Sequence, residues 1–164
     1  MKKWMGLLCL FLLSTVAQGN SIYLIRHAEK ANDGTKDPAL TEKGLQRAQN
    51  IVQMLSHAGI SKVYATDYKR TQMTAQPMAD YLGLEVLSYN PSELSVLVQQ
   101  LKDDQANVLV VGHSNTTPQL AHLLSGEPVV NLTEADFDYL FQVIILGELA
   151  TLNVLKSSPV NFSE

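Results

Sequence analysis

The chain has 164 residues, of which 46% are apolar and 17% charged, and its 12 basic and 16 acidic side chains give a net charge of −4. This composition is typical of a packed globular protein and is too apolar for a disordered one. A net-acidic chain is a poor candidate for a nonspecific nucleic-acid binder, and a single cysteine cannot form a disulfide framework or a zinc ribbon. The length predicts one ordinary domain. Only three of the basic residues are arginines: Arg26, Arg47 and Arg70.

The first residues have the order of a secretory signal peptide. A pair of lysines precedes an apolar run over 4–16, which is followed by small residues. This run is shorter than the stretch of about 20 residues that a membrane-spanning helix needs, so we expect cleavage and export, to the periplasm or the medium, rather than a retained membrane anchor. Cleavage after Ala17 and cleavage after Gly19 both fit the pattern. With the second site, the chain divides into a signal peptide (1–19) and a single domain (20–164) that has no cysteine.

Short apolar runs rich in β-branched residues alternate with helical patterns along the rest of the chain. Such runs are typical of strands that are buried on both faces of a parallel sheet. The C-terminal stretch 141–155 reads as two strands that turn at Gly147, a hairpin at one edge of the sheet. The other predicted strands lie at 21–25, 62–65 and 108–112, with a short one near 85–87.

Helical spacing of apolar residues predicts four helices between these strands. The first begins with Thr41 as N-cap, turns Leu45 inward and ends at Gly59. The fourth begins with Thr117 as N-cap and Pro118 at the first helical position. This alternation predicts an α/β fold, a three-layer sandwich with a mostly parallel central sheet and helices on both faces. The second and third helices are predicted over 67–82 and 92–102.

Polar side chains follow three of the predicted strands. Arg26 and His27 follow the first strand, Arg70 begins the helix after the second, and His113 follows the strand at 108–112. Ligands of open α/β sheets bind outside the carboxyl ends of the strands, so we expect these four side chains to converge. Imidazole can act as a nucleophile at neutral pH, and guanidinium groups bind tetrahedral oxyanions with paired donors. The set suits phosphoryl transfer through a phosphohistidine.

Several segments, in this order, resemble the histidine phosphatase (phosphoglycerate-mutase-like) superfamily. Residues 25–30 read Ile-Arg-His-Ala-Glu-Lys, which is similar to the Arg-His-Gly/Ala-Glu signature of that family. The turn at 37–44 and the segments 66–75 and 111–116 resemble further motifs of the family. The resemblance therefore covers nearly the whole domain.

The resemblance implies a phosphoglycerate-mutase-like fold and a phosphatase that hydrolyses phosphomonoesters or phosphoramidates through a phosphohistidine on His27. Arg26 and Arg70 are then phosphate ligands, and His113 is a second phosphate contact that stabilises the transition state. Neither a metal nor another cofactor is implied. The expected partner is a phosphorylated small molecule, an envelope component or a phosphoprotein, and not a nucleic acid.

Three further residues are candidates for the site. Mutases of the family carry a catalytic glutamate, and often a lid, between the second arginine and the second histidine. The segment 71–112 that separates Arg70 from His113 is short, which leaves no room for a lid and makes Glu93 the one acid placed for proton donation. A carboxylate favoured by a helix dipole is the alternative for Glu93. Asn32 and Asn115 are candidates for contacts to phosphate oxygens, or turn formers.

Other charged residues and histidines are expected to be structural. Arg47 lies opposite the apolar stripe of the first helix and is predicted to be solvated. For Glu29 we expect an ion pair with its neighbours Arg26 and Lys30, or a surface position. The two histidines inside predicted helices are expected to be hydrogen-bonded structural residues: His57 and His122.

Two other functions stay open. A phosphosugar mutase needs a closed site that keeps water from the phosphoenzyme, and no lid is predicted. A noncatalytic module that binds phosphate or another oxyanion would have no use for a histidine at position 27, which disfavours it. The compact site also resembles that of short phosphohistidine phosphatases, but their phosphorelay substrates are cytoplasmic and this chain is predicted to be exported.

Overall fold

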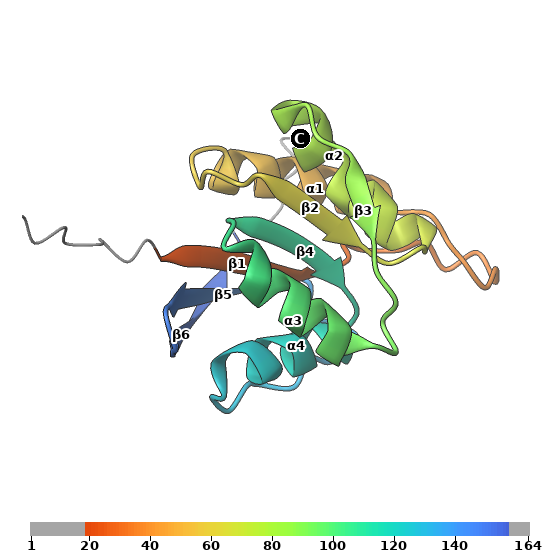
Figure 1. Cartoon of the computed structure of the whole chain (residues 1–164). Coiled ribbons are helices and arrows are strands. Elements are labelled where there is room, and N and C mark those ends of the chain that lie inside the picture. The colour runs from red at the N-terminus through yellow and green to blue at the C-terminus, as the bar shows by residue number, and fades with distance from the viewer. Residues whose placement is uncertain (1–18, 158–164) are drawn as a thin grey trace, which may run out of the picture.

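The computed structural model describes residues 19–157, which form a six-stranded sheet and four helices (Figure 1). The predicted signal peptide lies outside the described residues, apart from Gly19. The strands lie in the order β3-β2-β4-β1-β5-β6. In chain order the elements are β1 (Asn20–Arg26), α1 (Glu42–Leu55), β2 (Lys62–Ala65), α2 (Lys69–Leu82), β3 (Val86–Ser88), α3 (Leu94–Asp104), β4 (Val108–Gly112), α4 (Thr116–Ser125), β5 (Tyr139–Leu146) and β6 (Leu149–Lys156).

The pairing of the strands aligns their carboxyl ends. β1 and β4 are parallel, with Arg26 opposite Gly112, and β2 pairs in parallel with β4, with Ala65 opposite Val111. β5 runs antiparallel to β1, and β6 closes that edge as a hairpin that turns at Gly147. The mostly parallel sheet and the C-terminal edge hairpin are as the sequence predicts. The residues that follow β1, β2 and β4 therefore leave the sheet at one edge.

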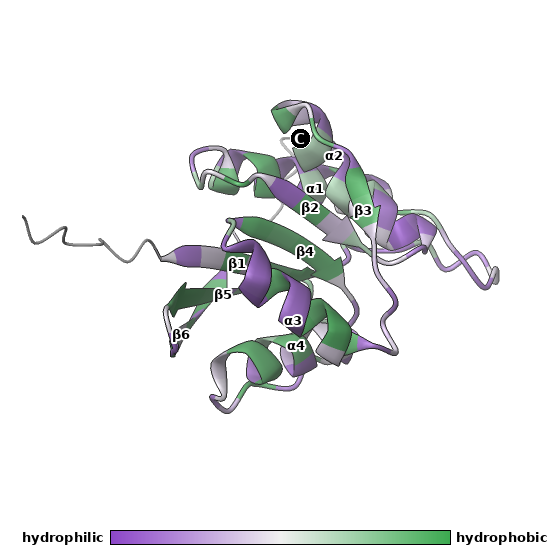
Figure 2. Cartoon of the chain, viewed as in Figure 1, coloured by the Kyte–Doolittle hydropathy of each residue, from purple (hydrophilic) through white to green (hydrophobic). Residues whose placement is uncertain are grey.

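Helices cover both faces of the sheet. α1 and α2 lie together on one face, and α3 and α4 lie on the other (Figure 1). One apolar core joins Leu101 of α3 to Phe141 of β5, and a second joins Met78 of α2 to Leu109 of β4. β4 is buried at every residue and hydrophobic along most of its length, whereas α3 carries hydrophilic residues on its outer side (Figure 2). The predicted three-layer α/β sandwich is confirmed.

Local signals set most boundaries of α1 and α2. The hydroxyl of Thr41 accepts a hydrogen bond from the Gly44 backbone and caps α1, and Gly83 ends α2 in the left-handed conformation. The prediction that Leu45 faces inward is wrong, because this side chain is 41% exposed. The backbone of Gly44 packs against the chain at Glu29, and the next residue is rotated by about 100° away from that contact.

α4 begins earlier than predicted, at Thr116, which places Pro118 in the third helical position. The hydroxyl of Thr117 donates to the Ile25 carbonyl at 3.2 Å, and that of Thr116 accepts from the His113 backbone at 3.1 Å. The two threonines tie the helix to β1 and β4, and the hydroxyl of Thr117, the predicted cap, is used in this contact. Proline is tolerated in a first turn because its missing N–H has no partner there. Within residues 19–157, no helix has the length and apolar content to cross a membrane.

Candidate active site

The four residues predicted at the strand ends lie around one cavity. Arg26 ends β1 and His27 follows it, Arg70 is in the first turn of α2, and His113 directly follows β4. All four line a cavity of about 400 Å³. Gly112 lets α4 pack closely against the end of β4, because a Cβ there would lie only 2.8 Å from the Thr117 hydroxyl.

The ring of His27 is held by a hydrogen bond from one nitrogen, and its other nitrogen has no hydrogen-bond partner in the described part of the chain. The residue is 2% exposed, and its Nδ1–H donates to the Ala28 carbonyl at 2.8 Å. Because a carbonyl only accepts, Nε2 of the neutral ring carries no proton. The loop itself is fixed by a bond from the His27 backbone to the Gly112 carbonyl and by one from the Ala28 backbone to the Thr74 hydroxyl. The lone pair on Nε2 is therefore the one that can attack phosphorus.

A chain of hydroxyl groups orients His113. Its Nε2 lies 2.9 Å from the Thr66 hydroxyl, which lies 2.9 Å from the Thr71 hydroxyl. The Thr71 hydroxyl reaches the Tyr68 carbonyl at 2.8 Å. Since that carbonyl can only accept, each member of the chain donates toward it, and His113 donates from Nε2. Its Nδ1 is left as an acceptor, 3.5 Å from Nη2 of Arg70.

Each arginine of the cavity has one buried N–H group without a hydrogen-bond partner among residues 19–157. These groups are Nε of Arg26 and Nε of Arg70. An unpaired buried donor costs about 1–3 kcal/mol, so an oxyanion that accepts from these groups would relieve that cost. The Arg70 guanidinium lies 4.3 Å over the Tyr68 ring and 3.7 Å from Asp37, and that of Arg26 lies 4.3 Å over Phe137. These contacts fix two planar cations beside the histidines.

Burial keeps both histidines neutral. It is the largest cause that lowers the pKa of His27 from 6.5 to about 4, and the positive charges of Arg26 and Arg70 lower it further. Burial, followed by the charge of Arg70, also lowers the pKa of His113 to about 4. The centroids of the two rings are 5.6 Å apart. At neutral pH both imidazoles are uncharged, so Nε2 of His27 can attack without a separate base.

The low pKa of His27 makes folding stability depend on pH. His27 of the unfolded chain binds a proton below pH 6.5, whereas His27 of the folded protein binds one only near pH 4. The free energy of unfolding is therefore highest above pH 6.5 and falls as the pH is lowered from 6.5 to 4. At pH 5, His27 should account for a loss of about 2 kcal/mol relative to pH 7. We expect urea denaturation in phosphate-free buffer to show a loss smaller by about that amount in His27→Asn. Equal losses in both proteins would contradict the pKa assigned to His27.

The loop after α4 adds a carboxylate that no sequence pattern pointed to. Glu134 accepts hydrogen bonds from Nη2 of Arg26 at 3.0 Å and from the Ser114 hydroxyl at 3.2 Å. The charge of Arg26 lowers the pKa of Glu134. The carbonyls of Thr133 and Asp136 accept from Nη1 of Arg26 at 2.7 and 3.2 Å. The cavity is completed by Lys30, Tyr68, Pro91, Ser92, Ser114, Asn115, Thr116 and Glu134.

The other predicted site residues lie in different places. Asn115 lines the cavity, at the N-cap position of α4. Asn32 is exposed in the loop between β1 and α1 and is not among the lining residues. Glu93 is exposed at the N-cap position of α3, where it accepts a hydrogen bond from Asn90 at 3.0 Å. The cavity wall includes Ser92 but not Glu93, so the acid that the geometry brings to the site is a different one.

The predictions for Arg47 and Glu29 are wrong. Arg47 is only 7% exposed, and its Nε and Nη2 donate to the two carboxylate oxygens of Glu29, each at 2.8 Å. Its Nη1 donates to Ser157 at 3.0 Å. Burial acts in the opposite direction, but the hydrogen bonds from Arg47 leave the pKa of Glu29 lowered. Glu29 thus pairs with α1 rather than with its neighbours Arg26 or Lys30, because its side chain turns toward that helix.

The two remaining histidines lie outside the cavity. Nδ1 of His122 donates to the Glu127 carbonyl at 2.8 Å, which is the structural role predicted for it. His57 is exposed in the turn after α1 rather than inside that helix. Among the residues that the structure describes, no group of three or more histidine, cysteine or acidic side chains could hold a metal ion.

A mostly parallel sheet with two histidines and two arginines at its carboxyl edge defines a phosphoglycerate-mutase-like α/β domain. Residues 22–90 match the model of the histidine phosphatase superfamily (branch 1), a span that includes Arg26, His27 and Arg70. Over this span the chain is similar to that superfamily.

Curated relatives match a part of the chain of similar length. The chain is similar to a probable phosphoglycerate mutase GpmB of Erwinia tasmaniensis, with 40% identity over 72 residues. A second probable GpmB, from an Enterobacter species, is 36% identical over 72 residues. Each match covers 40% of this chain and 34% of the relative. The chain therefore spans about a third of the length of the curated relatives it matches.

Solved structures share the whole fold. The protein histidine phosphatase SixA, complexed with tungstate, superposes with a TM-score of 0.67 at 21% identity, over 85% of this chain and 97% of that one. The α-ribazole phosphatase of Shigella flexneri gives a TM-score of 0.70 at 19% identity, over 88% of this chain and 100% of that one. The phosphoglycerate mutase of Bacillus anthracis gives 0.68 at 14% identity, over 85% and 93%. At these identities the similarity concerns the fold.

Proposed function

We propose that this protein is a phosphatase that hydrolyses phosphomonoesters through a phosphohistidine on His27. The observation that carries the proposal is the buried, neutral imidazole of His27, whose Nε2 is free, beside two arginines with unpaired buried donors. An imidazole lone pair is a competent nucleophile, and preorganised cations stabilise the charge of a transferring phosphoryl group. The match of residues 22–90 to the histidine phosphatase superfamily supports the same chemistry.

The reaction has two steps. Nε2 of His27 attacks the phosphorus, the P–N bond forms, and the ester bond breaks with its electron pair on the leaving oxygen, which takes up a proton. Water then attacks the phosphohistidine, the P–N bond breaks, and inorganic phosphate leaves. Arg26 and Arg70 neutralise the phosphoryl oxygens in both steps. A dianion beside His113 favours protonation of its Nδ1, which can then donate to the phosphate.

We assign proton donation to Glu134 rather than to Glu93. In the free protein Glu134 is ionised, because the charge of Arg26 lowers its pKa. When a substrate phosphate takes the donors of Arg26, this carboxylate loses its cation and faces a dianion, and both changes favour its protonated form. Glu134 lines the cavity and Glu93 does not. A protonated Glu134 can therefore give its proton to the leaving oxygen.

Matched variants separate the two acids. In Glu134→Gln we expect kcat for an alkyl phosphate to fall by about 10²–10⁴, with little change for an aryl phosphate, whose leaving group needs less help from an acid. Glu93→Gln should leave both rates unchanged, since the residue is exposed outside the cavity. Steady-state kinetics on both esters measure this. A loss confined to Glu93→Gln would show that the assignment to Glu134 is mistaken.

A phosphatase is favoured over a mutase. Between Arg70 and His113 the chain forms the rest of α2, then β3, α3, β4 and their connections, and no inserted domain shields the cavity within the described chain. A mutase must keep water from its phosphoenzyme. The basic and apolar order of the first residues supports export, so the proposed substrates are small organic phosphates, envelope components or phosphoproteins outside the cytoplasm.

The decisive experiment is a screen for phosphate release across these substrate classes with purified protein. The His27→Asn variant is the blank, because it lacks the nucleophile and keeps both arginines. Acid-quench labelling distinguishes the noncatalytic alternative, since a phosphoramidate is labile in acid and stable in alkali. Phosphate binding without turnover or label would support an oxyanion-binding module instead.

A further inference from the structure

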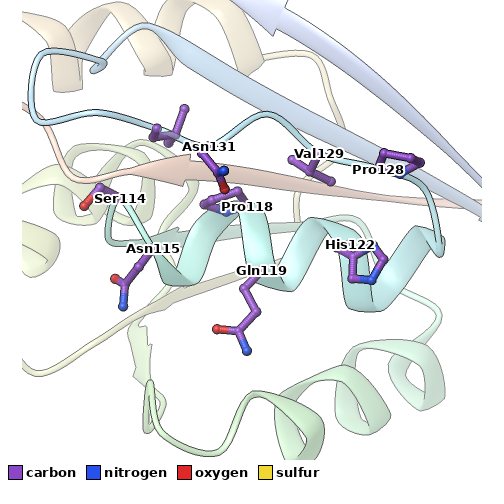
Figure 3. Close-up of a pocket in the computed structure, with 9 residues that line it drawn as sticks. Ser114, Asn115, Pro118, Gln119, His122, Pro128, Val129 and Asn131 are labelled. Atoms are coloured by element: carbon purple, nitrogen blue, oxygen red, sulfur yellow. The ribbon is translucent and has the colours of Figure 1, made fainter.

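A second cleft adjoins the phosphate cavity and extends along α4. Its volume is about 620 Å³, and it shares Ser114 and Asn115 with the cavity that holds His27. Figure 3 shows its residues strung along α4 and along the loop that follows this helix. The lining residues are Ser114, Asn115, Pro118, Gln119, His122, Pro128, Val129, Asn131 and Leu132.

The lining of this cleft is uncharged but rich in hydrogen-bonding groups. No lysine, arginine, aspartate or glutamate is among the lining residues. Three carboxamides, those of Asn115, Gln119 and Asn131, are exposed and available to a ligand. Apolar side chains line the same cleft, among them Val129 and Leu132, which are partly buried against the core. A carboxylate would find no cation here, whereas a neutral polar group would find both donors and acceptors.

The cleft has a direction and a length. It starts at Asn115 beside the phosphate cavity and reaches His122 in the last turn of α4, about 10 Å away along the helix. The His122 ring is fixed by its Nδ1 bond to the Glu127 carbonyl, which leaves Nε2 as an acceptor when the ring is neutral. A group attached to a phosphate in the cavity would reach these side chains if it were one or two sugar rings long.

We propose that this cleft binds the organic group of the phosphomonoester and that this group is an uncharged sugar. The proposal rests on the proposed phosphatase activity. A carboxamide offers one donor and one acceptor to neighbouring hydroxyls, and apolar side chains pack against the C–H face of a sugar ring. No phenylalanine, tyrosine or tryptophan lines the cleft, so it lacks the aromatic faces on which a nucleobase would stack.

The test compares four esters on five proteins. The esters are p-nitrophenyl phosphate, α-glucosyl phosphate, phosphoglycerate with its additional carboxylate, and uridine monophosphate. The proteins are the wild type, Gln119→Ala, Asn131→Ala, the double variant, and Gln53→Ala as matched control, an exposed amide of α1 on the other face of the sheet. For α-glucosyl phosphate we expect kcat/KM to fall about 3–10-fold in each single variant and more than 10-fold in the double variant. For p-nitrophenyl phosphate it should stay within about twofold in all five.

The outcomes separate this inference from the proposed function. Wild-type hydrolysis of p-nitrophenyl phosphate tests the phosphatase activity alone. If the wild type hydrolyses p-nitrophenyl phosphate, two results would overturn the sugar assignment. One is an equal loss of kcat/KM for p-nitrophenyl and α-glucosyl phosphate in the variants, and the other is a wild-type preference for phosphoglycerate or uridine monophosphate. If the wild type does not hydrolyse p-nitrophenyl phosphate, binding measured by calorimetry tests the inference instead. The double variant should then bind α-glucosyl phosphate more weakly and inorganic phosphate unchanged, and unchanged binding of both would overturn the inference.

Discussion

The His27→Asn protein should release phosphate from no ester, with kcat lowered by on the order of 10⁴ or more. Asparagine removes the only nucleophile of the proposed mechanism, while its amide can still donate to the Ala28 carbonyl that Nδ1 now uses. Arg26 and Arg70 are untouched, so inorganic phosphate should still bind. Phosphate release from p-nitrophenyl phosphate and rapid acid-quench labelling measure the two expectations, loss of turnover and loss of the phosphoenzyme.

The control for this variant is His57→Asn, which removes a histidine that is exposed after α1 and outside the cavity. It should keep wild-type turnover and label. Normal hydrolysis by the His27→Asn protein would refute the phosphohistidine mechanism, since no second nucleophile takes the place of Nε2.

The sequence is sufficient to place the four central side chains because of how parallel sheets are built. Arg26 ends β1 and His113 follows β4, and the pairing of Arg26 with Gly112 aligns the two strand ends. The position of Arg70 follows from one further rule, that the helix after a parallel strand begins at the carboxyl edge of the sheet. The pattern of the strands and one topological rule therefore predict the positions of the four central side chains of the cavity.

Contacts between distant loops follow no such rule. Glu134 lies 108 residues from Arg26 in the chain and belongs to no helix or strand, so neither periodicity nor a strand end indicates its position. Helical spacing placed Arg47 on a solvated face, yet its guanidinium is buried between Glu29 and Ser157, 110 residues away. The position of Glu93 between Arg70 and His113 makes it a candidate acid, but spacing alone does not fix where its carboxylate lies, and the cavity wall does not include it.

The loop that carries Glu134 links the proposed catalytic and specificity regions. Val129 and Leu132 of this loop line the cleft along α4, and Thr133 and Glu134 bind Arg26 directly afterwards. A ligand group in the cleft and a phosphate in the cavity would therefore touch the same short segment. This continuity gives a physical route by which the organic group of a substrate could affect the position of the proton donor.

Arg70→Ala should lower kcat by about 10²–10³, the usual effect of losing one preorganised donor to a developing charge. Arg70→Lys should recover little of this, because an ammonium group keeps the charge but lacks Nε and the planar fork that lies over Tyr68. The acid limb of kcat/KM should also move to higher pH in Arg70→Ala, since the charge of Arg70 adds to burial in lowering the pKa of both His27 and His113. Steady-state kinetics from pH 4 to 8, on an aryl phosphate, measure all three effects.

Lys69→Ala is the matched control, because it removes one positive charge from the same turn of α2 at an exposed position outside the cavity. A general electrostatic effect of α2 would make it resemble Arg70→Ala, and a specific phosphate contact would leave its kcat at the wild-type value. If Arg70→Lys matches the wild type, the guanidinium acts as a point charge and the paired-donor geometry is not what the site uses. If Arg70→Ala stays within about threefold of the wild type, Arg70 does not contact the phosphate, and the unpaired Nε of Arg26 is the donor that remains for it.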